Sequence, residues 1–127
     1  MHHAILSMSP ASKSPQRLEL SPEFSEWLFA SGVLADINKR IGSLLDQYEE
    51  DEVPPQSLPQ ILDVFRERER ELTESRGEEL EFIRGWDAER RPMVVKMPTA
   101  HVLKELAKCK SLIDMAMNEE VGLTFEL

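Results

Sequence analysis

The chain has 127 residues, which is enough for one hydrophobic core and too few for two domains. Its composition, 41% hydrophobic and 31% charged, is that of a globular protein, and no apolar run approaches the length that spans a bilayer. Cys109 is the single cysteine, so an intrachain disulfide is excluded and a reducing cytoplasm is the expected location.

The charge of the chain is acidic and unevenly distributed. The formal net charge is −9, with −10 in residues 46–89 and +5 in residues 90–110. Such an excess repels phosphate backbones and anionic lipids, so we expect neither nucleic acid nor membrane as a partner. It favours a basic protein, whose approach the negative potential would steer. A purely solubilising role is the competing explanation of the same charge.

The first residues indicate little regular structure. Residues 1–17 are rich in serine, proline and alanine, which predicts a flexible N-terminal tail ahead of a single globular domain over 18–127. Residues 17–20 alternate polar and apolar side chains and predict a short edge strand. Ser21 followed by Pro22 is a typical helix start, because the serine can cap the first turn and the proline fits its geometry.

A regular apolar pattern follows this start. The spacing alternates between three and four residues, and we expect one helix over about 22–50 with a kink at Gly32. We expect this seam to pack within the chain, with a dimer interface as the alternative. The seam consists of Trp27, Ala30, Leu34, Ile37, Ile41, Leu44 and Tyr48.

A second amphipathic helix is expected over about 58–89. Ser57 and Gln60 form a capping box at its start, and apolar residues return near its end at Leu80, Ile83 and Trp86. Because the two helices match in length, they predict a long antiparallel helical hairpin.

The last third indicates strand, helix and strand. Residues 93–97 predict a strand, the apolar residues between Val102 and Ala116 mark one helix face, and residues 121–127 alternate like a strand with one buried face. Short joins favour a βαβ unit with parallel strands. The expected fold class is therefore α+β and predominantly helical, with the hairpin followed by a small two- or three-stranded sheet.

No catalytic or cofactor motif is recognisable. His101 and Cys109 lie about 12 Å apart on the expected helix, too far for a nucleophile and its base. The glycines are scattered, so we expect no nucleotide cofactor, and no zinc-type spacing predicts a metal site. Four E-x-x-E pairs resemble part of the magnesium-binding pattern of the all-α nucleotide pyrophosphohydrolases, but the E-x-x-D that completes that pattern is absent from this sequence. The pairs are Glu23 and Glu26, Glu49 and Glu52, Glu71 and Glu74, and Glu78 and Glu81.

These observations favour a small acidic, non-enzymatic interaction protein. We expect it to bind and neutralise or mask a basic protein, as immunity proteins and antitoxins do. Two alternatives remain: a secretion or assembly chaperone acting as a homodimer, and a magnesium-dependent enzyme using helical carboxylates. The protein itself is expected to be a monomer or a homodimer. The residues expected to contact a basic partner are Glu49, Glu50, Asp51, Glu52, Glu67, Glu71, Glu74, Glu78 and Glu79.

Overall fold

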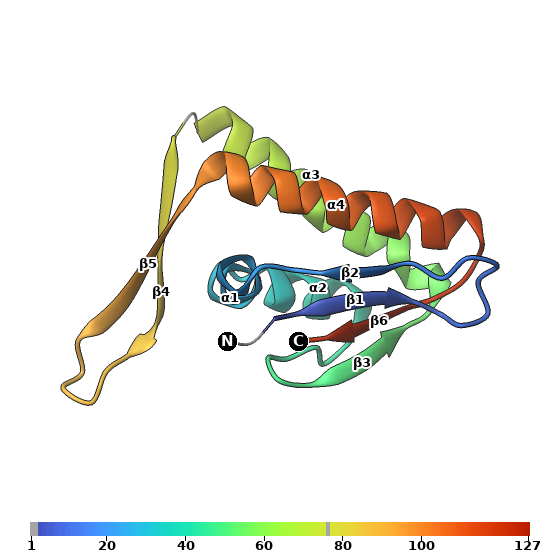
Figure 1. Ribbon diagram of the computed structural model, residues 1–127, viewed down its shortest axis with the longest axis horizontal. Coiled ribbons are helices and arrows are strands. Elements are labelled where there is room, and N and C mark those ends of the chain that lie inside the picture. Colours follow the sequence, from blue (N-terminus) through green and yellow to red (C-terminus); the bar gives the residue numbers. More distant parts are fainter. Residues whose placement is uncertain (1–2, 76) are drawn as a thin grey trace.

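The structure is a computed structural model that describes residues 3–75 and 77–127 (Figure 1). Over these residues the chain forms four α-helices, a four-stranded antiparallel sheet and a separate two-stranded hairpin. The predicted α+β class is confirmed. Several elements of the structure have other bounds or other pairing partners than the sequence predicted.

The N-terminal region contributes a strand to the sheet. Strand β1 (Ile5–Met8) pairs antiparallel with β2 (Arg17–Glu19), so residues 5–8 do not belong to a flexible tail. The side chains of Ala4, Leu6 and Met8 are all buried, and this alternation is the reason the segment folds as a strand. Strand β2 lies at an edge of the sheet, as its sequence predicted.

The prediction of a single helix over 22–50 is wrong. Helix α1 (Pro22–Ala30) starts with the Ser21 cap, whose hydroxyl accepts a hydrogen bond from the Phe24 amide at 3.2 Å. Gly32 takes a left-handed conformation with φ of 83°, which separates α1 from α2 (Val33–Ile41). Gly42, with φ of 69°, ends α2 in the same way.

The prediction of a helix over 58–89 is wrong beyond Ser75. Strand β3 (Glu50–Val53) and a short 3-10 turn lead into α3 (Leu58–Ser75), and the chain then enters β4 (Glu79–Trp86). At the start of β4, glutamate and apolar residues alternate with the two-residue period of a strand. The three-residue spacing of Leu80, Ile83 and Trp86 also fits a helix, and this led to the wrong prediction. The two long helices that pack together are therefore α3 and α4, which run in opposite directions (Figure 1).

The strand, helix and strand of the last third are confirmed as β5 (Pro92–Pro98), α4 (Thr99–Asn118) and β6 (Leu123–Glu126). Their parallel pairing is wrong. A short turn lets β5 pair with β4, its neighbour in sequence, and β6 lies between β1 and β3. All of these pairings are antiparallel.

The larger sheet has the strand order β2-β1-β6-β3, with one face covered and one face open to solvent. Leu6, Val53 and Phe125 point from the covered face into a core that all the helices share. On the open face stand Ser7, Thr124 and Glu126. This arrangement leaves β2 and β3 as the two edges of the sheet.

The hairpin β4–β5 projects from the rest of the protein (Figure 1). Near its base Met97 is buried, but Ile83, Trp86 and Val94 farther along are 46%, 62% and 51% exposed. None of the helices in the described part of the chain is both long enough and apolar enough to cross a membrane.

Candidate functional site

An acidic surface surrounds strand β3 at one edge of the larger sheet. The ladder with β6 places Glu50 opposite Glu126 and Glu52 opposite Thr124, on the open face. Asp51 alternates to the other side of the strand but is also exposed, because no further strand follows at this edge. We use the term acidic surface for the carboxylates of Asp46, Glu49, Glu50, Asp51 and Glu52.

The carboxylates of the acidic surface are exposed and lack cationic partners. Within residues 3–75 and 77–127, no lysine, arginine or histidine forms an ion pair with any of them. By contrast, Glu67 on α3 pairs with Arg40, and Glu69 pairs with Lys110 at 2.6 Å. The chain therefore neutralises part of the acidic face of α3 itself and leaves the surface around β3 charged.

The nine acidic residues expected to contact a partner do not form one surface. Glu49, Glu50, Asp51 and Glu52 lie together at the β3 edge, and Glu67 is held by Arg40. The remaining four lie at the opposite end of the protein, where α3 leads into β4 (Figure 1). They are Glu71, Glu74, Glu78 and Glu79, and all are exposed.

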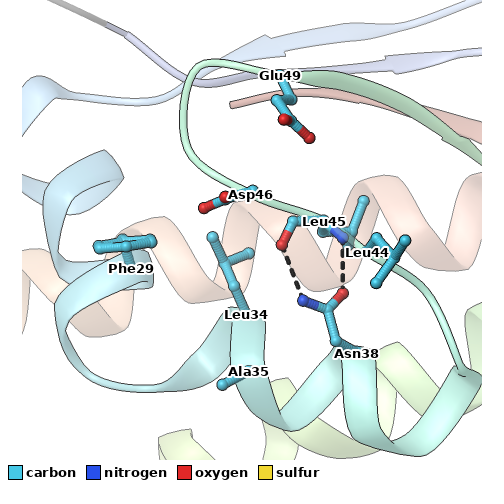
Figure 2. A pocket seen from close by; sticks show the side chains of 8 residues that line it. All are labelled: Phe29, Leu34, Ala35, Asn38, Leu44, Leu45, Asp46 and Glu49. Carbon is cyan, nitrogen blue, oxygen red and sulfur yellow. Dashed lines mark hydrogen bonds between the residues drawn. The ribbon is translucent and has the colours of Figure 1, made fainter.

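Two hollows adjoin the acidic surface, and Leu44 and Leu45 line both. The larger, about 540 Å³, lies between α1, α2 and the loop before β3, with Phe29 and Leu34 among its walls (Figure 2). Asp46 and Glu49 stand on its rim, as Figure 2 shows. The smaller, about 390 Å³, is lined in part by Asp51 and Glu52 of β3. Apolar walls with acidic rims are suited to a ligand that is both cationic and partly apolar.

The loop that forms these hollows is fastened by Asn38 of α2. The side-chain amide of Asn38 donates to the Leu45 carbonyl, and its oxygen accepts from the Leu45 amide, both at 2.8 Å (Figure 2). The same oxygen accepts a hydrogen bond from the Ser43 hydroxyl at 2.6 Å. Leu45 is consequently buried while Leu44 is 82% exposed, so the hydrogen bonds of Asn38 fix the apolar part of the site.

The sequence pattern misassigned the apolar side of this site. It predicted Leu44 and Tyr48 in a helical seam, but both lie beyond the end of α2 and are largely exposed. Lys39 and Arg40 in the last turn, followed by Gly42, are a typical helix stop that would have placed this end correctly. No sequence signal indicated that Asn38 holds the loop.

A polar cluster between α1 and α4 resembles a catalytic triad only in composition. The Ser21 hydroxyl donates to Glu105 Oε2 at 2.7 Å and lies 3.1 Å from His101 Nε2. Glu105 Oε2 lies 3.5 Å from that same nitrogen, whereas a triad places the acid at the other ring nitrogen. The Ser21 hydroxyl also caps α1. The cluster thus supplies hydrogen-bond donors to the buried carboxylate of Glu105 and links the start of α1 to α4.

The other residues that the sequence analysis considered for catalysis or metal binding do not form a site in the described part of the chain. Cys109 is buried, and burial together with the nearby Glu105 charge raises the pKa of its thiol above the ordinary range. Among the described residues, no three histidine, cysteine or acidic side chains come together as metal ligands. Of the four E-x-x-E pairs, 49/52 and 78/81 include strand residues, so the helical geometry expected for them does not form.

Comparison of the chain with models of protein families, with curated proteins and with solved structures found no match.

Proposed function

We propose that the protein is a non-enzymatic binding protein whose acidic surface masks a basic region of another protein. The observation that carries the proposal is the contrast between carboxylates. Those around β3 have no cationic partner in the described part of the chain and lie together beside two hollows, whereas Glu67 and Glu69 of α3 are paired with Arg40 and Lys110. Five uncompensated charges in one place repel one another, and a bound cationic ligand would relieve this repulsion.

The backbone of β3 supports an extended basic segment as the ligand. The Leu127 amide donates to the Glu49 carbonyl at 2.8 Å. Because inward and outward groups alternate in an antiparallel ladder, the peptide groups of Glu50 and Glu52 face away from β6. A basic strand added at this edge could form hydrogen bonds with these peptide groups and ion pairs with the carboxylates. A second copy of β3 would be repelled by its own charge.

The hollows beside β3 support an apolar anchor next to the basic residues of the ligand. Phe29 is 49% exposed and Leu44 is 82% exposed, and burying both would add a hydrophobic contribution that charge alone lacks. Binding energy at protein interfaces concentrates in such pockets, whereas exposed charges mainly set the association rate and the choice of partner.

Calorimetry with a synthetic peptide that alternates lysine with leucine tests this proposal. The variant Glu50→Gln/Asp51→Asn/Glu52→Gln should weaken binding about tenfold or more, and Leu44→Ser should weaken it with less effect of salt. The matched control is Glu71→Gln/Glu74→Gln/Glu78→Gln, which removes the same charge from the other end of the protein. Equal weakening by both triple variants would show that net charge alone attracts the peptide and would overturn the site.

A second candidate function, an assembly chaperone, is favoured by the β4–β5 hairpin. Ile83, Trp86 and Val94 expose apolar surface on a projecting element, and such surface commonly binds another protein. The predicted seam between Trp27 and Tyr48 does not offer a dimer interface for this role, because Trp27, Leu34 and Ile37 are buried in the core. A stable dimer that Trp86→Ser converts to a monomer would favour the chaperone.

A further inference from the structure

We propose a second binding site, in the groove between β2 and α4, for an extended acidic segment of a partner protein. This site lies at the opposite edge of the sheet from β3 and takes a ligand of opposite charge. It goes beyond the function proposed above and does not depend on it.

The edge strand β2 offers unused backbone positions. The amide of Met8 donates to the Gln16 carbonyl, and that of Leu20 donates to the Ala4 carbonyl, both at 2.9 Å. Gln16 and Leu20, which flank β2, and Leu18 between them therefore direct their peptide groups toward β1. By the alternation of an antiparallel ladder, the peptide groups of Arg17 and Glu19 face outward. An extended segment can pair with these groups as an additional strand.

The groove beside β2 has an apolar floor. It measures about 460 Å³, and Leu18, Leu112 and Met115 contribute to its lining. Met115 is 38% exposed, so the groove leaves apolar surface in contact with solvent. Alternate side chains of an added strand would point toward this floor.

The rim of the groove is cationic. Arg17, Lys104 and Lys108 all line it, and none forms an ion pair with a described residue. Lys104 and Lys108 are one helical turn apart on the same face, where two like charges disfavour each other. By contrast, Lys96 pairs with Glu81 and Lys110 with Glu69. Three cations that gather around one apolar groove without an ion pair in the described part of the chain suit an anionic ligand.

The combination favours an extended acidic peptide over a compact anion. The cations belong to two elements, β2 and α4, and they flank an apolar floor beside outward-facing peptide groups. Carboxylates that alternate with apolar side chains match this pattern along a strand. Strand β3 of a second copy carries similar charge and is the rival occupant, which the experiment below distinguishes.

Fluorescence anisotropy with a labelled peptide that alternates glutamate with valine tests the site. We expect Lys104→Glu/Lys108→Glu to weaken binding about tenfold or more. The control Lys39→Glu/Arg66→Glu makes the same charge change at exposed positions away from the groove and should have a much smaller effect. Equal weakening by the two variants, or equal binding of a peptide with lysine in place of glutamate, would overturn the site.

Strand addition is tested with the wild-type protein, so the result does not depend on the folding of a variant. A peptide with alternate amides methylated loses the hydrogen bonds along one edge and should bind at least tenfold more weakly. Unchanged affinity would overturn strand addition. Sedimentation of the protein alone tests the rival occupant, and self-association that Lys104→Glu/Lys108→Glu abolishes would identify a second copy and overturn the proposal of a separate partner.

Discussion

Glu50 of β3 stands directly opposite Glu126 of β6 on the open face of the sheet. Two carboxylates in register across a ladder repel each other, and a sequence selected only for stability would place a cation at one of these positions. Together with the unpaired acids on either side, this pair supports the proposal of a binding surface that is kept at a cost in stability.

Replacing Glu50 with glutamine should therefore stabilise the protein. The side chain keeps its size, and the repulsion with Glu126 disappears, so the free energy of unfolding should rise by about 0.5 kcal/mol. Urea denaturation measures the change. Glu71→Gln, an exposed residue near the end of α3, serves as the control and should have little effect. A loss of stability in Glu50→Gln would mean that the carboxylate has a favourable role in the fold.

Gly122 should not tolerate a side chain. A Cβ at this position would lie 2.6 Å from the carbonyl oxygen of Val53, a backbone atom that cannot turn aside. We expect Gly122→Ala to displace the end of β3 and to cost roughly 1–3 kcal/mol. Gly77→Ala is the matched control, because its Cβ would meet nothing closer than 3.9 Å. Thermal denaturation of both variants tests the expectation, which equal melting temperatures would contradict.

The Asn38 side chain should hold the site in its binding conformation. Asn38→Ala removes both hydrogen bonds to the Leu45 backbone and should cost roughly 1–3 kcal/mol. Amide hydrogen exchange should be faster at Leu45, and calorimetry should show weaker binding of the lysine-leucine peptide. Asn118→Ala, at the exposed end of α4, is the control. Unchanged exchange at Leu45 would mean that other contacts fix the loop.

Asp87 should make the tip of the β4–β5 hairpin sensitive to acid. Its carboxylate accepts hydrogen bonds from the Arg91 and Glu89 amides, and the first of these contributes most to lowering its pKa below the ordinary 3.8. Because the folded pKa is the lower one, the stabilisation is present above the unfolded pKa and is lost as the pH falls through the folded value.

Proton NMR of the Glu89 and Arg91 amides measures this effect at the tip. Their protection from exchange should fall in the acid range below the ordinary aspartate pKa of 3.8. Asp87→Asn should reduce the protection at neutral pH and remove its dependence on acid. A carboxylate that titrates at or above its ordinary value would contradict the assignment.

The fold was predictable where local signals agree and unpredictable where pairing partners decide. The helix start at Ser21 and the helix over residues 99–118 follow from capping and periodicity alone. The break at Gly32 was not predictable, because α1 and α2 pack on one core and the apolar spacing therefore continues across the glycine. The pairing of β6 with β1 joins residues at opposite ends of the chain, and no local pattern specifies that partner.

The candidate site was predictable in its charge and not in its shape. Glu49 to Glu52 stand out in the sequence as an acidic run, and they are exposed as expected. Their position on an edge strand depends on β6, and the hollows depend on the loop that Asn38 fastens. Both are tertiary features that charge and hydropathy along the chain do not encode.

The most direct test of the proposed function is the association rate with the lysine-leucine peptide, measured by stopped flow over a range of ionic strength. The wild-type rate should fall steeply as salt rises, because uncompensated charges at β3 steer the encounter. Glu50→Gln/Asp51→Asn/Glu52→Gln should associate more slowly at low salt and lose much of the salt dependence, while Glu71→Gln/Glu74→Gln/Glu78→Gln should keep both. If the β3 variant keeps the wild-type rate and salt dependence, the acidic surface does not recognise a basic partner.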